Sequence, residues 1–160
     1  DTCEGVRAIV DSGIPVVGHI GLMPQSINIT SGYSVQGKTE KHAKIIIKEA
    51  QSLNDAGIFA LVLEGIPADL AAIITKQLSI PTIGIGSGKN CDGQIQVFHD
   101  VVGLYSNFIP KHAKQYLNGF EKLSQGLRSY KDEVEAAIFP NNKHCIQLDK
   151  TVLKKISENN

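Results

Sequence analysis

Ala60-Leu-Val-Leu-Glu64-Gly-Ile-Pro67 is the stretch that decides the fold of this chain. Ile58 to Leu63 is a continuous apolar run, which is typical of a strand buried on both faces of a parallel sheet. The run ends in one ionisable side chain, Glu64, and a turn containing Gly and Pro follows. The carboxyl ends of such strands are where parallel α/β barrels build their active sites. The sequence therefore predicts a parallel α/β fold with Glu64 at its functional edge.

A second stretch repeats this pattern. The apolar residues from Ile14 to Gly18 predict a short strand, and His19 follows at its expected end. A long segment rich in Gly, Ser, Asn and Gln then runs from Gly21 to Lys38, and a long irregular segment in a compact domain is usually functional. His19 and Glu64 are therefore the leading site candidates, as a proton-transfer pair or a substrate clamp.

Predicted strands and helices alternate along the whole chain, which indicates βαβ units and a parallel sheet. We expect strands near Pro15–Gly18, Phe59–Leu63, Thr82–Ile85 and Ile95–Phe98, and helices at Glu4–Ser12, Thr39 to Gly57, Ala68–Leu78, Lys111–Leu117, Leu123–Ala137 and Thr151–Ile156. Four parallel strands can neither close a barrel nor shield both sheet edges. We therefore interpret residues 1–160 as the C-terminal half of a single (β/α)8 TIM-barrel domain, with no second domain.

Composition excludes several function classes. Lys plus Arg and Asp plus Glu both total 16, so no net charge favours nucleic acid or an anionic membrane. The apolar runs are shorter than a membrane span, and no signal peptide is visible. The three cysteines lack metal-ligand spacing, and reduced thiols predict a cytoplasmic location. Because the chain begins without Met, already inside what looks like a helix, we interpret it as a fragment.

Each site candidate also has a structural interpretation. Glu64 is a general base if the strand end removes it from water and points it at a substrate. Alternatively, it pairs with a basic group at the barrel rim or caps the helix that begins near Pro67. His19 can bind a substrate carbonyl or carboxylate, relay a proton or ligate a metal, or it simply bonds to a loop backbone.

Three other motifs are weaker. The run Ile83-Gly-Ile-Gly-Ser-Gly88 lacks the acidic residue of a dinucleotide site, so we favour a strand that needs small residues where a ligand or neighbouring backbone comes close over a phosphate cradle. His99-Asp100 forms a catalytic pair or, as we favour, a hydrogen-bonded loop anchor. Tyr33, together with Gln36 and Lys38, is a candidate lid or a solvated loop.

Taken together, the motifs closely resemble the ketopantoate hydroxymethyltransferase family. The resemblance extends over nearly the whole chain, through Gly13–Asn28, Gly32–Tyr33, Val35–Gly37, Leu61–Pro67, Ile80–Gly88, Cys91–Gln94, Val97–Asp100, Pro110–Lys111 and Phe139–Pro140. Local departures are Ser34, Lys38, Gly65 and His112, which stand where the family commonly has Lys, Arg, Cys and an aromatic residue.

The resemblance implies a (β/α)8 barrel enzyme of pantothenate biosynthesis. It implies transfer of a hydroxymethyl group from 5,10-methylenetetrahydrofolate to 3-methyl-2-oxobutanoate, giving 2-dehydropantoate. Glu64 then falls on the family's proton acceptor and His19 on a substrate-binding histidine. The family binds Mg²⁺ through residues of its first four strands, so no metal ligand is expected in this chain. The resemblance also implies a homo-oligomer whose partners are small molecules, neither nucleic acid nor membrane.

Two other functions remain open at this point. The chain is alternatively part of another lyase or mutase of the phosphoenolpyruvate/pyruvate barrel superfamily, or a non-catalytic half-barrel that assembles only with a partner. We expect the isolated chain to be inactive, whether it is half of the transferase or a non-catalytic half-barrel.

Overall fold

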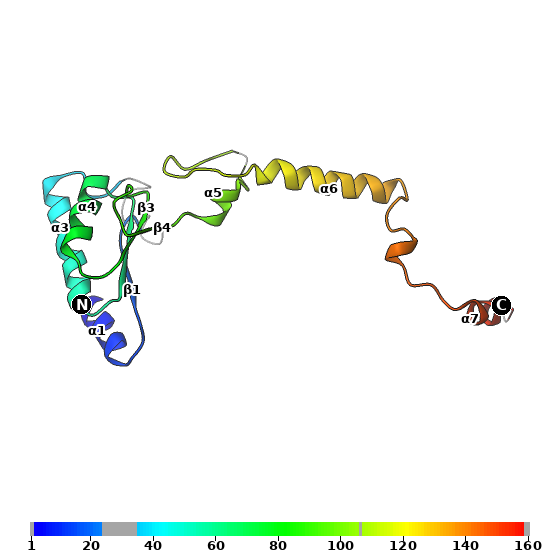
Figure 1. Cartoon of the computed structure of the whole chain (residues 1–160), viewed down its shortest axis with the longest axis horizontal. Helices are drawn as coiled ribbons and strands as arrows, with labels where there is room; N and C mark the ends of the chain where they lie inside the picture. Colours follow the sequence, from blue (N-terminus) through cyan, green and yellow to red (C-terminus); the bar gives the residue numbers. More distant parts are fainter. Residues whose placement is uncertain (1, 24–34, 106, 159–160) are drawn as a thin grey trace.

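The computed structural model describes residues 2–23, 35–105 and 107–158. Four strands form one parallel sheet in the order in which they occur along the chain: β1 (Val17–Gly21), β2 (Ala60–Glu64), β3 (Thr82–Ile85) and β4 (Gly93–Gln94). Figure 1 shows this sheet with α3 and α4 beside it. The predicted α/β fold with parallel strands is therefore confirmed.

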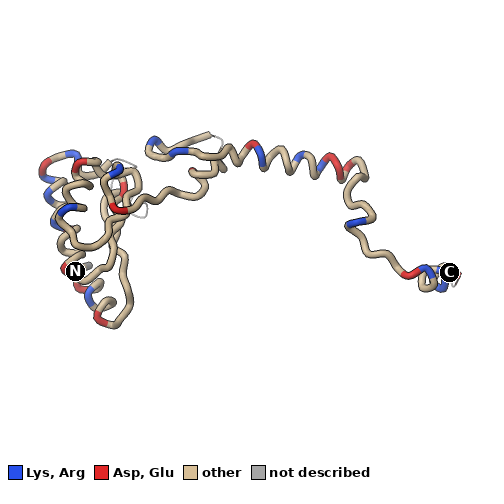
Figure 2. The backbone as a smooth tube through the Cα atoms, in the orientation of Figure 1, with Lys and Arg blue, Asp and Glu red and all other residues tan. Residues whose placement is uncertain are grey.

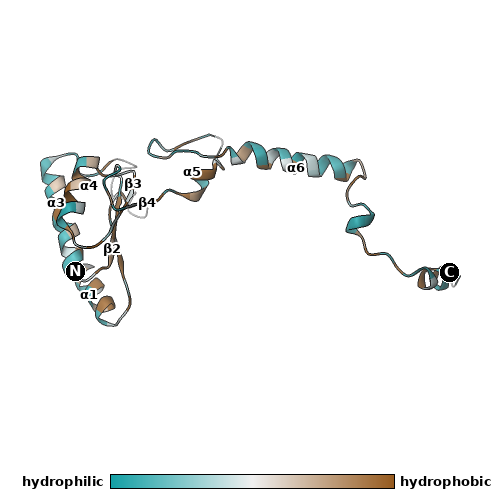
Figure 3. Ribbon diagram, in the orientation of Figure 1, coloured by the Kyte–Doolittle hydropathy of each residue, from teal (hydrophilic) through white to brown (hydrophobic). Residues whose placement is uncertain are grey.

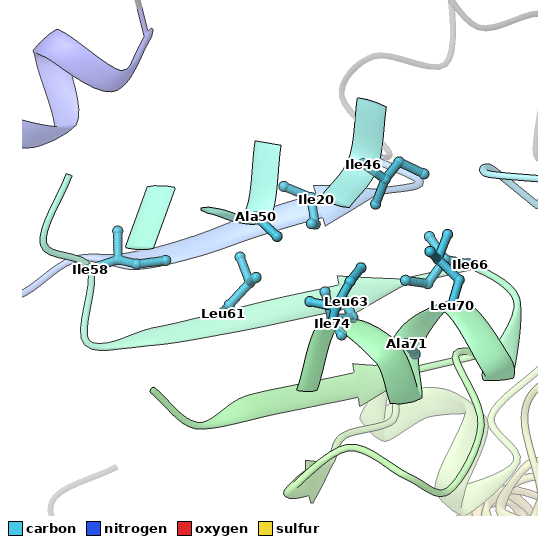
Figure 4. Packing of buried hydrophobic residues seen from close by; sticks show 10 residues of the cluster. All are labelled: Ile20, Ile46, Ala50, Ile58, Leu61, Leu63, Ile66, Leu70, Ala71 and Ile74. Carbon is cyan, nitrogen blue, oxygen red and sulfur yellow. The ribbon is translucent and has the colours of Figure 1, made fainter. Parts of the chain in front are cut away.

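One layer of helices covers one face of the sheet. It contains α3 (Glu40–Asp55) and α4 (Ala68–Gln77), and α1 (Thr2–Asp11) packs beside α3. Thr39 caps α3 as predicted, because its hydroxyl accepts a hydrogen bond from the His42 amide at 3.3 Å. Figure 4 shows the core between the two layers, formed by Ile20, Ile46, Ala50, Ile58, Leu61, Leu63, Ile66, Leu70, Ala71 and Ile74.

The two faces of the sheet differ in what covers them. Ile20, Leu61 and Leu63 point at the helices and are buried. Because side chains alternate along a strand, their neighbours point the other way. On that second face His19, Val62 and Ile83 are half-buried and Val17 is exposed. Apolar residues therefore occupy both faces, although helices among the described residues cover only one.

The C-terminal part leaves the sheet. After the short α5 (Phe98–Val102) come α6 (Gly119–Glu135), the 3-10 turn η2 (Asn142–His144) and α7 (Lys150–Ser157). Figure 1 shows α6 and α7 extending away from the strands. We call residues 2–23 and 35–94 the body, and residues 119–158 the arm. No helix among the described residues is long and apolar enough to cross a membrane.

The first strand begins and ends later than predicted. It spans Val17–Gly21 and not Ile14–Gly18, so His19 lies within β1 and does not follow it. The pairing with β2 causes this shift, because Val17 lies opposite Ala60 and Gly21 opposite Glu64. The backbone pairing then continues past the strand, where the Leu22 amide donates to the Glu64 carbonyl at 2.8 Å.

Two C-terminal predictions are wrong. The fourth strand is Gly93–Gln94 and does not reach Phe98, where α5 begins, and residues 111–117 form no helix. The Gln96 side chain explains both results. Its amide bonds the carbonyl of Lys114 at 2.8 Å and accepts from the Lys114 amide at 2.9 Å. These bonds draw the segment away from β3 and occupy a backbone amide that a helix would need.

The later helices agree better with the prediction. Helix α7 (Lys150–Ser157) matches Thr151–Ile156 closely. Helix α6 begins at Gly119, four residues before the expected Leu123, because the Asn118 side chain accepts from the Glu121 amide and caps it there.

Candidate active site

The register between β1 and β2 brings His19 and Glu64 to one face of the sheet. His19 lies directly opposite Val62, and Glu64 follows Val62 by two residues. Paired residues of neighbouring strands share a face, and so do alternate residues of one strand. Both side chains therefore point away from the helix layer. The predicted pair is confirmed as a spatial pair, although His19 reaches it from inside its strand.

The two side chains are in direct contact. His19 Nε2 lies 3.0 Å from Glu64 Oε2, and the side chains are 32% and 16% exposed. The distance suits an ion pair, but the ring N–H is not aligned with the carboxylate oxygen. Nε2 is buried and has no hydrogen-bond partner among the described residues. We therefore treat the contact as a close approach of two polar groups, with His19 Nε2 still able to bond to a ligand.

Backbone bonds hold the turn that carries Glu64. The Glu64 carbonyl accepts from Leu22 at 2.8 Å, and the Gly65 amide donates to the Ile85 carbonyl at 2.9 Å. The Gly65 carbonyl accepts from the Gln36 amide at 2.9 Å. Gly65 has a φ of +58°, a conformation that favours glycine over the family's Cys. Three neighbouring segments therefore fix the direction in which Glu64 leaves its strand.

Ser87 also holds this turn through hydrogen bonds, a role that the sequence did not predict. Its buried hydroxyl donates to the Leu63 carbonyl at 2.8 Å and accepts from the Ile66 amide at 3.3 Å. The two bonds bracket Glu64 on both sides. A serine between two glycines gave no local signal for this role, since its partners lie more than twenty residues away along the chain.

A cleft of about 930 Å³ opens along the unpaired edge of β1. Its walls come from β1, α1, α3 and the segment at Gln36 and Gly37, and His19 is one of its lining residues. Glu64 is not among the residues that line this cleft.

The opposite end of the sheet is held by a hydrogen-bond network. Asp92 accepts from the Thr82 amide at 2.8 Å and from the Thr82 hydroxyl at 3.0 Å, and these bonds lower the pKa of the Asp92 carboxyl. Burial raises the pKa of the neighbouring Cys91 thiol, which keeps it protonated and unreactive. The carboxyl end that holds Glu64 is therefore the better candidate for chemistry.

A divalent metal does not fit the described residues by themselves. Mg²⁺ prefers six oxygen ligands in an octahedral arrangement. No group of three His, Cys, Asp or Glu side chains in the described part of the chain is placed to hold a metal ion. His19 and Glu64 supply one nitrogen and one carboxylate, which is not a magnesium site.

The remaining motif predictions have separate outcomes. A Cβ atom on Gly84 would lie 2.9 Å from the Cys91 sulfur, so the atom that crowds this glycine belongs to a side chain and not to the predicted ligand or neighbouring backbone. His99 and Asp100 lie in α5, not at a strand end, and His99 stacks on Tyr105. The lid residue Tyr33 lies outside the described residues.

His112, another departure from the family pattern, lies over the end of β3. A Cβ atom on Gly86 would come within 3.1 Å of the His112 ring, so the imidazole covers the backbone beside Ile85. The His112 residue itself is exposed.

Comparison with known proteins gives one consistent result. The sequence profile described as ketopantoate hydroxymethyltransferase matches residues 1–142. Proteins named 3-methyl-2-oxobutanoate hydroxymethyltransferase are 50% identical in Clostridium beijerinckii, 51% in Clostridium kluyveri and 50% in a Dehalococcoides mccartyi strain. The matches cover 94%, 95% and 99% of this chain but only 55%, 54% and 56% of those proteins. The chain thus spans about half the length of these curated relatives.

Proposed function

The chain belongs to the ketopantoate hydroxymethyltransferase family, and from this membership we propose that it supplies the proton-abstracting half of such a transferase. The proposed acceptor substrate is 3-methyl-2-oxobutanoate, and the proposed hydroxymethyl donor is 5,10-methylenetetrahydrofolate. The names of the relatives support hydroxymethyl transfer to the keto acid. The folate donor is our extension from the resemblance.

The observation that carries the proposal is the 3.0 Å approach of His19 to Glu64 at the carboxyl end of the sheet. Hydroxymethyl transfer to a 2-oxo acid requires loss of the proton from the carbon next to the carbonyl. Glu64 is a partly buried carboxylate on a fixed turn, and this arrangement suits a general base.

His19 has a different task in the proposed reaction. Its buried Nε2 is free of hydrogen bonds to the described residues and lies beside the proposed base. A protonated Nε2 can donate to the keto acid's carbonyl or carboxylate oxygen and so orient the substrate over Glu64. We assign Mg²⁺, which would stabilise the enolate, to residues on the part of the family fold without a counterpart here. No step proposed for this chain passes through it.

The proposed architecture is half of a (β/α)8 barrel. Both β1 and β4 are edge strands of the described sheet, and the second face carries apolar side chains that no described helix covers. A barrel removes sheet edges and buries an apolar interior, so both features support barrel closure by further strands. The match to about half of each relative is in keeping with this number of strands.

We also propose a cytoplasmic location. Cys91 and Cys145 form no disulfide bond, as expected for a protein of a reducing compartment.

The test uses this chain co-expressed with the portion of the Clostridium kluyveri relative that it does not match. Deuterium exchange at C3 of the keto acid, with folate omitted, isolates proton abstraction from transfer. We expect Glu64→Gln to lower the exchange rate by about 10²- to 10⁴-fold, because the amide keeps the side chain's size but cannot accept the proton. Keto-acid binding should change little.

The matched control is Glu40→Gln, the same chemical change on an exposed residue of α3. It should exchange at the wild-type rate. Wild-type exchange by Glu64→Gln would show that Glu64 is structural. Exchange that depends on Glu64 but without transfer when folate is added would favour another carbon–carbon lyase of the same superfamily.

His19→Asn is expected to act mainly on substrate orientation. Asparagine keeps a hydrogen-bond donor near the position of the ring but changes its reach. The Michaelis constant for the keto acid should therefore rise more than the exchange rate at saturation falls. A loss of saturated exchange as large as that of Glu64→Gln would instead make His19 part of the proton relay.

A further inference from the structure

A short basic segment lies between α5 and α6 and takes no part in the proposed proton transfer. Its three basic residues are Lys111, His112 and Lys114, all of them exposed, and we call them the basic cluster. The backbone turns here, because the Ala113 amide donates to the Pro110 carbonyl at 2.9 Å. Figure 1 shows the chain returning from α5 toward the strands before α6 begins.

Two contacts hold the basic cluster beside the carboxyl end of the sheet. The Gln96 side chain bonds both backbone groups of Lys114, at 2.8 Å and 2.9 Å. The His112 ring lies over Gly86, where an added Cβ atom would be 3.1 Å away. Gly86 directly follows the residue of β3 that pairs with Glu64. The cluster therefore lies at the same edge of the sheet as the proposed base, next to the neighbouring strand.

The positive charge of the cluster is not neutralised by the protein. Residues 101–118 contain two lysines and no Asp or Glu, although acidic and basic residues balance over the whole chain. The ion pairs of the described residues include neither Lys111 nor Lys114. Figure 2 shows both lysines as blue segments on this loop. Lys114 Nζ lies 5.0 Å from the centre of the Tyr116 ring, a contact that leaves its charge in place. Clustered cations at the edge of a candidate site favour an anionic ligand.

The chemistry of the two proposed substrates decides which anion fits. The keto acid has one carboxylate, adjacent to its carbonyl, so this group stays inside the site when the substrate lies over Glu64. The folate donor carries its carboxylates on a glutamate tail, at the far end of the molecule from the one-carbon group. When the one-carbon group meets the keto acid, the tail has to leave the site past its edge. Cations at that edge suit a tail with several carboxylates.

We propose that Lys111, His112 and Lys114 form an anion subsite for the glutamate carboxylates of the folate donor. This inference rests on the proposed function, from which it takes the donor. The two lysines supply charge, and the His112 ring supplies an N–H donor. Each ion pair at such exposed groups is weak and is screened by salt, so binding depends on several carboxylates acting together. The subsite should therefore prefer a donor with several glutamates.

Equilibrium dialysis tests this preference, using the chain co-expressed with the unmatched portion of the Clostridium kluyveri relative. The two probes are tetrahydrofolate with one glutamate and with three. At low salt the triglutamate should bind about three- to tenfold more tightly, and added salt should reduce the difference. Lys111→Gln combined with Lys114→Gln should abolish most of it.

The matched control is Lys122→Gln combined with Lys143→Gln, which removes the same charge from exposed positions of the arm. This control should keep the wild-type preference. His112→Phe retains an aromatic ring over Gly86 but removes the N–H donor, so it should lose about twofold in triglutamate affinity. Unchanged affinity in His112→Phe would remove the histidine from the subsite.

The remaining outcomes separate this inference from the proposed function. If wild type bound both probes equally, or if the control lost the preference as fully as the cluster variant, the subsite would be overturned while the folate donor stood. If wild type bound neither probe, the folate donor itself would fail, and the subsite with it. Deuterium exchange at C3 with folate omitted distinguishes the two substrates. Loss of that exchange in the cluster variant would assign the lysines to the keto acid's carboxylate and overturn the proposal.

Discussion

The body and the arm contain equally regular helices, but they differ in what those helices contact. In the body, α3 and α4 cover strands in which Leu61 and Leu63 are fully buried. In the arm, apolar residues of α6 and α7 are all largely exposed. Figure 3 shows the apolar residues gathered along the body's strands and interspersed with polar ones along α6. Local sequence signals therefore suffice to form a helix, whereas burial requires the register of a sheet.

The largest contrast between the two regions should come from truncating an apolar side chain in each. Leu63→Ala removes a fully buried side chain from the centre of the core and should lower the free energy of unfolding of the body by about 2–5 kcal/mol. Hydrogen exchange of the Ala60–Glu64 amides measures this loss directly, since these amides open only with the core.

Leu123→Ala is the matched change in the arm. Leu123 is 59% exposed, so dilute protein should change by no more than about 0.5 kcal/mol, and exchange in β2 should be unaffected. If Leu123→Ala destabilised the body as strongly as Leu63→Ala, α6 would have to pack on the sheet in solution, and the contrast between the regions would be wrong.

A smaller effect is expected from Asp92 and depends on pH. Hydrogen bonds from Thr82 lower the pKa of the Asp92 carboxyl below its ordinary 3.8. The folded state therefore favours the ionised form, so this contribution to stability is present above 3.8 and disappears as the pH falls through the lowered pKa. Wild type should be more stable to urea than Asp92→Asn at about pH 6, and the two should converge toward about pH 2.

Asp149 is the control for this effect in the arm. Its pKa is also lowered, first by the Thr151 hydroxyl and then by the Thr151 amide, but it caps the exposed α7. Asp149→Asn should leave the urea unfolding of the body unchanged at every pH. A pH dependence as large as that of Asp92 would connect α7 to the body's stability.

The sequence predicted the parts of the molecule that depend on neighbouring residues. The apolar run ending at Glu64, the cap at Thr39 and helix α7 are all local patterns, and the structure confirms them. The predictions failed where a distant partner decides the conformation. Gln96 bonds the Lys114 backbone eighteen residues away and so shortens β4.

The candidate site shows the same division. Glu64 was predicted at its strand end because the strand and the turn are both local features. The placement of His19 depends on its register against Val62, which no feature of residues 14–19 encodes. Ser87 was missed because its hydroxyl bonds to Leu63 and Ile66 on another strand's turn. Contacts across strands therefore set the limit of what the sequence predicts here.

The last comparison concerns two helix caps whose hydrogen bonds have the same length. In each cap, the side chain accepts a hydrogen bond at 3.3 Å from the backbone amide three residues later. The Glu121 amide donates to Asn118 in α6, and the His42 amide donates to Thr39 in α3. Replacing either by Ala should cost about 1 kcal/mol. In α6 that loss should appear as fraying, because an isolated helix of its length is marginally stable in water.

In α3 the same loss should appear only as a lower stability of the whole body, since packing on the sheet holds the helix until the core opens. Hydrogen exchange distinguishes the two results. Asn118→Ala should speed exchange in the first turns of α6 alone, and Thr39→Ala should speed the slowest amides of β2 and α3 together. Equal, local fraying in both variants would mean that packing on the sheet holds α3 no better than α6 is held. The body and the arm would then differ in how buried their side chains are, but not in whether their helices unfold together with the core.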